Sequence, residues 1–318
     1  MAPPSILIIG ATGNTGRGVT STLPSLLKQT KSLSNHHIIA LSRSKDSPAA
    51  KTTAASGIEV IEFNWIELTA SWLESHKVQR IFIASHNEPT HFAEEGQLHN
   101  EALLAGVKYV VRISTTAANV APNYRAYYPR THWAIDQMLS SKEFDAMEYT
   151  SLQPNVFFPY SMQGAVDFIR HYRKTGSQPE EGLSTMLDEH APVGIIAADD
   201  VGVFAAHLLA SDNISPHAGK HYVLNGPEDI SGRKIVDLVE EYIGGEKVKK
   251  TVFRDLRLIE KWADATQNGS KNVIRSVVNA PVTGYEGKCK AETTSEEVLR
   301  IAAPKGTARG YLEGMLKE

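Results

Sequence analysis

Short apolar runs alternate with amphipathic stretches along the first half of the chain. The apolar runs predict buried strands at residues Ile6–Ile9, His37–Ser42, Glu59–Phe63, Arg80–Ala84, Val107–Ile113 and Tyr149–Pro154. The intervening stretches repeat apolar residues at helical spacing, as Val19, Leu23 and Leu27 do after the first run. Strands that alternate with helices in this way are typical of a parallel sheet covered on both faces. The pattern therefore predicts an α/β fold with a doubly wound parallel sheet.

The pattern becomes less regular beyond residue 155. A short strand is expected at Ala191–Ile196, followed by a side-chain-capped helix that begins near Asp199. Another strand is expected at His221–Leu224, and the chain from Phe253 onward predicts mostly short helices. We therefore expect a dinucleotide-binding domain over residues 1–155 and a smaller α/β substrate lobe over residues 156–318, with its chain interleaved with the sheet.

A glycine-rich turn lies between the first predicted strand and the first predicted helix. Its glycines are spaced as Gly10-x-x-Gly13-x-x-Gly16, which differs from the commonest G-x-G-x-x-G dinucleotide pattern. Gly10 would form the tight turn, Gly13 would admit a phosphate, and Gly16 would let the helix contact the strand. The helix N-terminus would attract the anion. The sequence predicts a dinucleotide site rather than a plain turn, with further polar groups supplied by Thr12, Asn14 and Thr15.

The end of the second predicted strand indicates which dinucleotide is bound. In doubly wound sheets an acidic residue at this point binds the ribose 2′-hydroxyl of NAD, whereas an arginine accommodates the 2′-phosphate of NADP. Here Arg43 comes first and Lys45 follows closely. A planar guanidinium is well matched to a phosphate. The sequence predicts NADP(H), and the alternative is a solvated basic loop.

The ends of the later strands carry further candidate cofactor contacts, because ligands of such sheets lie beyond the carboxyl ends of the strands. Asn64 and Trp65 are candidates for the adenine, or else a strand-end cap and a core aromatic residue. Ser85 and His86 would lie near the nicotinamide half, although a loop histidine can also be simply solvated. Ser114 follows the fifth strand.

Composition narrows the range of functions. The 318 residues are 42% apolar and 22% charged, with a formal net charge of −3, so no basic footprint for nucleic acid is apparent. No apolar run approaches the ~20 residues of a membrane span, and no signal peptide is recognisable. The single Cys289 excludes an internal disulfide and is expected to be a packing residue. We expect a cytoplasmic protein that is a monomer or a homodimer. We expect no bound metal, because no metal-ligand motif is present.

Seven stretches share a family likeness: Gly10–Gly16, Ser42-Arg43, Ala105–Ser114, Thr131–Leu139, Tyr149–Phe157, Ala198–Val201 and Gly219–Pro227. Together they resemble the NmrA-like branch of the atypical short-chain dehydrogenases. The resemblance implies a Rossmann-type domain with a smaller lobe, NADP(H) over Gly10–Gly16, and Arg43 at the 2′-phosphate. Pro154, Asn155 and Phe157 would shape the nicotinamide pocket. Gln153 departs from the arginine of many relatives, which leaves open how this strand end is held. Thr131–Leu139 is similar to a helix of NADPH-dependent quinone reductases and triphenylmethane reductases.

The Tyr-x-x-x-Lys pair of typical short-chain dehydrogenases is altered in this chain. Tyr128 matches the tyrosine, but His132 replaces the lysine. Tyr128 or His132 could donate a proton while NADPH supplies hydride, or both could merely order an aromatic loop. We expect a reductase of a small, planar, apolar conjugated substrate that is quinone-, enone- or imine-like. The apolar wall would come from Phe157, Phe158, Tyr160 and Met162. The alternative is a non-catalytic NADP(H) redox sensor that acts through protein partners.

Overall fold

A seven-stranded parallel sheet forms the centre of the molecule, in a computed structural model that describes residues 3–267 and 269–317. The strand order β3-β2-β1-β4-β5-β6-β8 is the Rossmann order with one further strand at the edge. This order confirms the predicted doubly wound sheet. The strands are β1 (Ser5–Ile9), β2 (His37–Ser42), β3 (Glu59–Glu62), β4 (Val78–Ile83), β5 (Tyr109–Ile113), β6 (Glu148–Pro154) and β8 (Lys220–Leu224).

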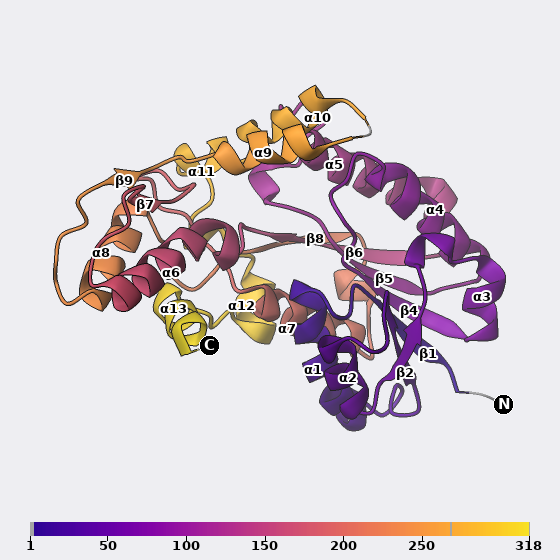
Figure 1. Ribbon diagram of the computed structural model, residues 1–318. Coiled ribbons are helices and arrows are strands. Elements are labelled where there is room, and N and C mark those ends of the chain that lie inside the picture. Colours follow the sequence, from indigo (N-terminus) through magenta and orange to yellow (C-terminus); the bar gives the residue numbers. More distant parts are fainter. Residues whose placement is uncertain (1–2, 268, 318) are drawn as a thin grey trace.

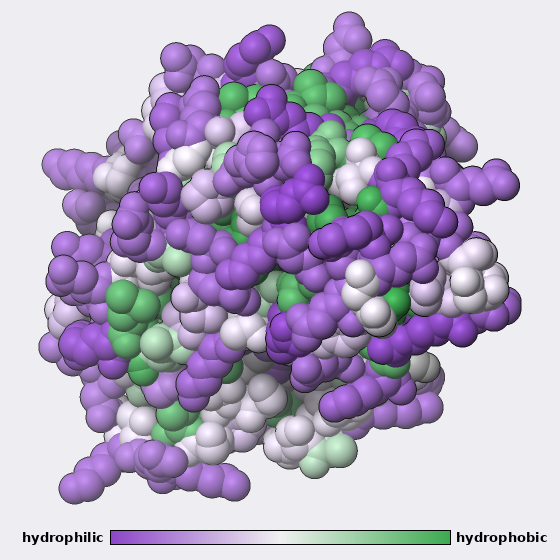
Figure 2. All heavy atoms as spheres, turned by 90° about the vertical axis from the view of Figure 1, so that its left-hand side faces the viewer, coloured by the Kyte–Doolittle hydropathy of each residue, from purple (hydrophilic) through white to green (hydrophobic). Residues whose placement is uncertain are grey.

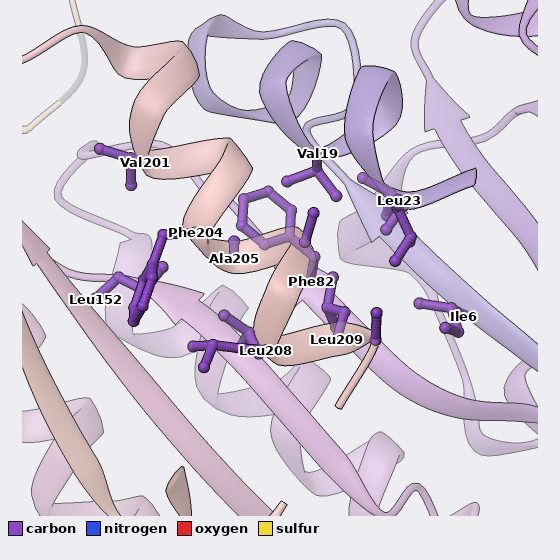
Figure 3. Packing of buried hydrophobic residues seen from close by; sticks show 14 of the residues in the cluster. Ile6, Val19, Leu23, Phe82, Leu152, Val201, Phe204, Ala205, Leu208 and Leu209 are labelled. Atoms are coloured by element: carbon purple, nitrogen blue, oxygen red, sulfur yellow. The ribbon is translucent and has the colours of Figure 1, made fainter. Parts of the chain in front are cut away.

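Helices cover both faces of this sheet (Figure 1). One face carries α1 (Asn14–Gln29), α2 (Pro48–Ala55) and α7 (Ala198–Leu209), and the other carries α3 (Ala70–Ser75), α4 (His91–Leu104) and α5 (Tyr127–Leu139). Because side chains alternate along a strand, Ile6 and Ile8 of β1 join the core beneath α1 and α7 (Figure 3), while Leu7 and Ile9 join the opposite core. Burial on both faces explains the continuous apolar run of β1.

Two glycines allow α1 and α7 to touch backbone to backbone. A Cβ atom on Gly202 would lie 2.1 Å from the carbonyl oxygen of Thr15, and one on Gly18 would lie 2.3 Å from that of Asp199. Neither position has room for a side chain. Since Thr15 belongs to the first turn of α1, α7 fixes the helix end that follows the glycine-rich turn.

Replacing Gly202 by Ala is therefore expected to destabilise the protein by about 2 kcal/mol, in the range for overpacked cores. Gly314→Ala is the matched control, because Gly314 is also helical and has no neighbouring atom within 4 Å of the added Cβ. Alanine favours a helix over glycine by up to about 1 kcal/mol, so the control should become slightly more stable. Urea unfolding measures the stability of both variants. If Gly202→Ala were stabilised as much as Gly314→Ala, the close contact between α1 and α7 would be refuted.

The second lobe is built mainly from the last part of the chain. Its core lies between α6 (Phe158–Thr175), α8 (Gly232–Tyr242) and α13 (Ala308–Lys317), beside a two-stranded parallel sheet of β7 (Leu183–Ser184) and β9 (Thr251–Val252). The remaining helices are short, as predicted: α9 (Arg257–Ala265), α10 (Lys271–Arg275), α11 (Val282–Tyr285) and α12 (Glu296–Ala302). Helices α9 and α10 extend back from the lobe to the start of α5, where Ala263 and Ile274 pack with Tyr127.

The lobe face in Figure 2 is mostly hydrophilic, and its apolar side chains form separate patches. No helix in the described parts of the chain has both the length and the apolar character needed to span a bilayer.

Two local predictions were wrong. Ala191–Ile196 forms only isolated bridges, at Val193 and Ile196, because its backbone bonds are divided among several segments. The first turn of α7 follows Ala197 without a side-chain cap, since the Asp200 carboxylate accepts the backbone N–H groups of Lys305 and Gly306 instead. Helix α1 continues through Pro24, because buried Leu23 and Leu27 hold it against the sheet.

Candidate functional site

A cavity of about 1240 Å³ lies at the carboxyl ends of the strands, between the sheet and the second lobe. This is where ligands of doubly wound sheets are expected. It brings together residues from the β1–α1 turn, from the ends of β4, β5 and β6, and from α5. The predicted site residues that line it are Gly10, Gly13, Asn14, Thr15, Ser85, Ser114, Tyr128, His132, Pro154, Asn155 and Phe157.

Three glycines shape the β1–α1 turn in different ways. Gly10 has φ +79°, and a Cβ atom there would lie 2.6 Å from the carbonyl oxygen of Ala84. Gly16 has no room either, since its Cβ would lie 2.1 Å from the Gly10 oxygen. Gly13, in contrast, is exposed and serves as the N-cap of α1, with no capping side chain within the described residues. The first amides of α1 therefore face the cavity with no acidic side chain in that turn, which suits an anion.

The hydroxyl of Ser114 is an unsatisfied polar group beside this turn. Ser114 is 5% exposed and lines the cavity, yet its Oγ has no hydrogen-bond partner among the residues that the structure describes. Leaving a buried hydroxyl without a partner costs about 1–3 kcal/mol. A polar ligand atom in the cavity would remove that cost, so Ser114 fits a bound cofactor.

The residues predicted to hold the adenosine half lie outside the cavity lining. Arg43 and Lys45 follow β2 as exposed side chains, at the same sheet edge as the glycine-rich turn because β2 pairs with β1 in parallel. Asn64 is exposed, and half-buried Trp65 lies 5.7 Å from the ring of His86. Thr12 and Gly16 are also absent from the described lining. The adenosine contacts therefore stay predictions.

Other predicted contacts are already engaged within the protein. His86 lies outside the lining, and its Nε2 is 2.5 Å from Glu94 Oε2. The amide of Asn155 donates to Asn225 Oδ1 and to the Cys289 carbonyl oxygen, both at 2.9 Å. Asn155 thus lines the cavity while tying the end of β6 to the lobe. Cys289 is buried and its thiol donates to Thr283 Oγ1, consistent with packing.

Tyr128 presents its phenol to the cavity from the first turn of α5. Burial raises the pKa of Tyr128 to about 12, although a hydrogen bond with Thr115 lowers it in part. The phenol therefore keeps its proton throughout the physiological range. It can donate a hydrogen bond to a ligand, but it is a weaker acid than an ordinary tyrosine.

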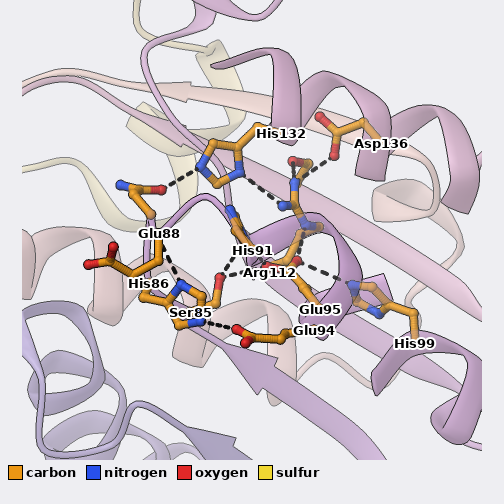
Figure 4. Close-up of polar contacts among 12 residues, drawn as sticks. Ser85, His86, Glu88, His91, Glu94, Glu95, His99, Arg112, His132 and Asp136 are labelled. Carbon is orange, nitrogen blue, oxygen red and sulfur yellow. Dashed lines mark hydrogen bonds and ion pairs between the residues drawn. The ribbon is translucent and has the colours of Figure 1, made fainter. Parts of the chain in front are cut away.

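His132 lies one helical turn further along α5 and is neutral. Its Nδ1 is 3.0 Å from Arg112 Nη2, and its Nε2 is 3.2 Å from Asn87 Oδ1 (Figure 4). Burial and the positive charge of Arg112 together hold the pKa of His132 well below its usual range. An arginine can only donate, so Nδ1 is the acceptor and Nε2 carries the proton.

Behind His132 lies a buried cluster of charged residues that the sequence reasoning missed. Arg112 is fully buried and binds Glu95 at 2.7 Å and Asp136 at 2.8 Å. Glu95 also lies 2.5 Å from His91 Nε2 and 3.2 Å from His99 Nε2. An arginine inside the apolar strand Val110–Ile113 and the i, i+4 spacing of His91, Glu95 and His99 were the available signals.

The electrostatics of this cluster favour an ionised Glu95. Burial raises the pKa of Glu95. The charge of Arg112 and the hydrogen bonds from His91 and His99 lower it by more, so that the pKa lies well below its usual range. Ser85 donates to Glu95 Oε2 at 2.6 Å, so this cavity residue is attached to the cluster. Within residues 3–267 and 269–317, no three His, Cys, Asp or Glu side chains are grouped to hold a metal ion.

The apolar wall of the cavity differs from the predicted one. Phe157 and Tyr160 line it, but Phe158 and Met162 are packed in the lobe core and do not. Their place is taken by other residues of the second lobe, which the sequence reasoning did not single out. These include Met186, Leu187, Leu256, Ile259, Trp262 and Tyr285.

Comparison with known proteins identifies the family. Residues 4–269 match the model of the NmrA-like family, and the chain belongs to that family, as its motifs predicted. Over 262 residues it is 24% identical to a (4-alkanoyl-5-oxo-2,5-dihydrofuran-3-yl)methyl phosphate reductase of Streptomyces griseus subsp. griseus. That match covers 82% of this chain and 79% of the relative.

Solved structures share the whole fold. An NADPH-dependent quinone oxidoreductase from Escherichia coli, complexed with NADPH, superposes with a TM-score of 0.69 at 19% identity, covering 98% of this chain and 99% of that one. A Citrobacter sp. triphenylmethane reductase complexed with NADP(H) gives a TM-score of 0.68 at 17% identity, covering 98% and 100%. At these identities the likeness establishes the fold.

Proposed function

We propose that this protein is an NADPH-dependent oxidoreductase that transfers hydride to a small conjugated or aromatic substrate, such as a quinone, enone or imine. The observation that carries the proposal is the single cavity that joins the N-terminus of α1 to Ser114, Tyr128 and His132 and to an apolar wall. The relatives named above support it, because each is a reductase or an oxidoreductase by name and two were solved with NADPH or NADP(H).

The cofactor would be held along the carboxyl edge of the sheet, and it supplies the hydride when bound. The first amides of α1 and Gly13 would receive the pyrophosphate. Arg43 and Lys45 would bind the 2′-phosphate, with Asn64 and Trp65 at the adenine. Ser114, Pro154 and Phe157 would border the nicotinamide half.

The donors in the cavity suit substrates that need little acid catalysis. Tyr128 has a pKa of about 12 and His132 is neutral, so neither is a strong proton donor at neutral pH. Both can donate hydrogen bonds to an oxygen that gains negative charge. Conjugated acceptors need little acid catalysis, because their reduced anions are stable enough to persist until Tyr128 or water supplies a proton.

The test is NADPH oxidation, followed by absorbance, with a panel of quinones, enones and triarylmethane dyes, beside a calorimetric titration of NADPH. Binding with turnover of a panel member supports the proposal. Binding without turnover across a broad panel favours the redox sensor, for which the neutral His132 and weakly acidic Tyr128 also argue. Absence of NADPH binding would refute both functions.

Arg43 should decide the choice between the two dinucleotides. Arg43→Asp is expected to weaken NADPH binding about 30-fold, since a charged hydrogen-bonded pair contributes roughly 1.5–3 kcal/mol, and to leave NADH binding nearly unchanged. Lys51→Asp makes the same charge change at an exposed position of α2 and should affect NADPH little. Calorimetry measures the affinities of Arg43→Asp for NADPH and for NADH, and that of Lys51→Asp for NADPH. Equal losses of NADPH and NADH affinity in Arg43→Asp would refute the contact between Arg43 and the 2′-phosphate.

A further inference from the structure

The orientation of the His132 ring is fixed from the side away from the cavity. Arg112 Nη2 donates to Nδ1 at 3.0 Å, so the only ring proton is on Nε2, and this edge points toward Asn87 at the cavity (Figure 4). His132 is 2% exposed and lies in the cavity lining. A single N–H group therefore faces the cavity from a ring that cannot turn without losing its arginine contact.

Arg112 itself cannot move freely, because carboxylates hold its other nitrogens. Nε donates to Glu95 and Nη1 donates to Asp136, and all three side chains are buried. Glu95 belongs to α4 and Asp136 to α5, so two helices and strand β5 fix the guanidinium in place. A guanidinium held by two separate carboxylates is a rigid support for the imidazole.

The contact between His132 and Asn87 is the weaker of the two ring contacts. Its length is 3.2 Å, and Asn87 is an exposed residue between β4 and α4 that also lines the cavity. A ligand oxygen could take the place of Asn87 Oδ1 without disturbing the Arg112 side. The hydroxyl of Tyr128 belongs to the same cavity, and the two rings lie 6.4 Å apart.

We propose that Arg112 is a positioning residue that holds His132 as the neutral Nε2–H tautomer, and that this N–H binds the carbonyl oxygen of a conjugated substrate. The identity of the ligand rests on the proposed reductase function, whereas the tautomer does not. The arrangement gives His132 the role of a fixed hydrogen-bond donor, distinct from that of a general acid. Its donor would be aimed where the substrate oxygen gains charge.

The groups around His132 favour the neutral ring over the imidazolium. Arg112 from β5 and the His91 ring from α4, at 4.9 Å, disfavour a second positive charge. Glu95 on α4 favours one, and Asp136 lies on the far side of Arg112. Tyr128 on α5 keeps its proton and adds no charge. We expect kcat to be independent of His132 protonation between pH 6 and pH 8.

The tautomer is tested by long-range ¹H–¹⁵N correlation spectra of the whole protein labelled at its histidine rings, without cofactor or substrate. His132→Gln assigns the signal by removing it. We expect a protonated Nε2 and an accepting Nδ1 from pH 6 to pH 8. In Arg112→Lys the ring should lose this single tautomer, whereas Asp136→Asn, which leaves the Arg112–His132 contact in place, should keep it. A wild-type ring protonated at Nδ1, or titrating near pH 6.5, overturns the proposal even if Arg112→Lys fails to fold.

The donor role is tested by a pair of substitutions and by a quinone probe, menadione. His132→Gln retains an N–H group at the same reach and should keep kcat within about fivefold, whereas His132→Leu should lower kcat about 100-fold with NADPH affinity retained. Bound menadione should shift the wild-type Nε2–H signal. Equal kcat losses, or bound menadione with an unshifted signal, refute the donor role. Failure of menadione to bind or react in any variant excludes it from the proposed substrates and refutes the donor role toward its carbonyl oxygen, and the tautomer result remains.

Discussion

Gly13→Val should abolish NADPH binding and leave the fold intact. Gly13 is exposed, and a Cβ atom there would have only the Gly10 carbonyl oxygen nearby, at 3.1 Å. Valine can therefore be accommodated by the unliganded protein. Its side chain would occupy the space in front of the first amides of α1, where the pyrophosphate is proposed to lie. We expect a Kd increase of at least about 100-fold, or about 2.7 kcal/mol.

Gly16→Val is the matched comparison. Gly16 lies in the same turn, but it is the folded protein, and not a bound cofactor, that leaves no room for a side chain there. Its Cβ would lie 2.1 Å from the Gly10 oxygen and 2.7 Å from the Ala11 Cα, so the folded protein itself has no room. Gly16→Val should lower the melting temperature strongly, whereas Gly13→Val should keep it. Calorimetric titration and thermal unfolding separate the two effects. Normal NADPH affinity of Gly13→Val would place the pyrophosphate elsewhere.

The sheet and the cofactor turn could be predicted because their causes are local. The run Ile6–Ile9 is buried on both faces, and the glycines that follow it are required by contacts within a few residues and by Ala84 on the neighbouring strand. The convergence of Ser114 and Pro154 on the same cavity followed from the parallel topology alone.

The rest of the site depends on contacts between distant parts of the chain. Trp262 and Tyr285 form the cavity wall through the path of the C-terminal helices, which no periodic pattern reveals. Phe158 and Met162 have the right apolar character but point into the lobe core. The role of Arg112 depends on its ion pairs with Glu95 and Asp136, which lie on two different helices and far from Arg112 in the sequence.

The partners of Arg112 should also dominate the stability of the sheet domain. Glu95→Gln is expected to lower the free energy of unfolding by about 3–5 kcal/mol, because the fully buried Arg112 would lose one of its two carboxylates. The new amide would also direct N–H groups at Arg112, His91 or His99, all of which donate to Glu95 in the native protein. Urea unfolding at pH 7 measures the change.

The pH dependence gives the same prediction an independent check. Because the pKa of Glu95 is lowered from its ordinary value of 4.5, its stabilisation is complete above pH 4.5 and is lost as the pH falls through the folded-state pKa. Glu95→Gln should therefore lose stability less steeply than the wild type below pH 4.5. Glu94→Gln is the control on the same helix: its partly exposed pair with His86 should contribute less than about 1 kcal/mol. Equal destabilisation by the two substitutions would show that the buried cluster contributes no more than a surface pair.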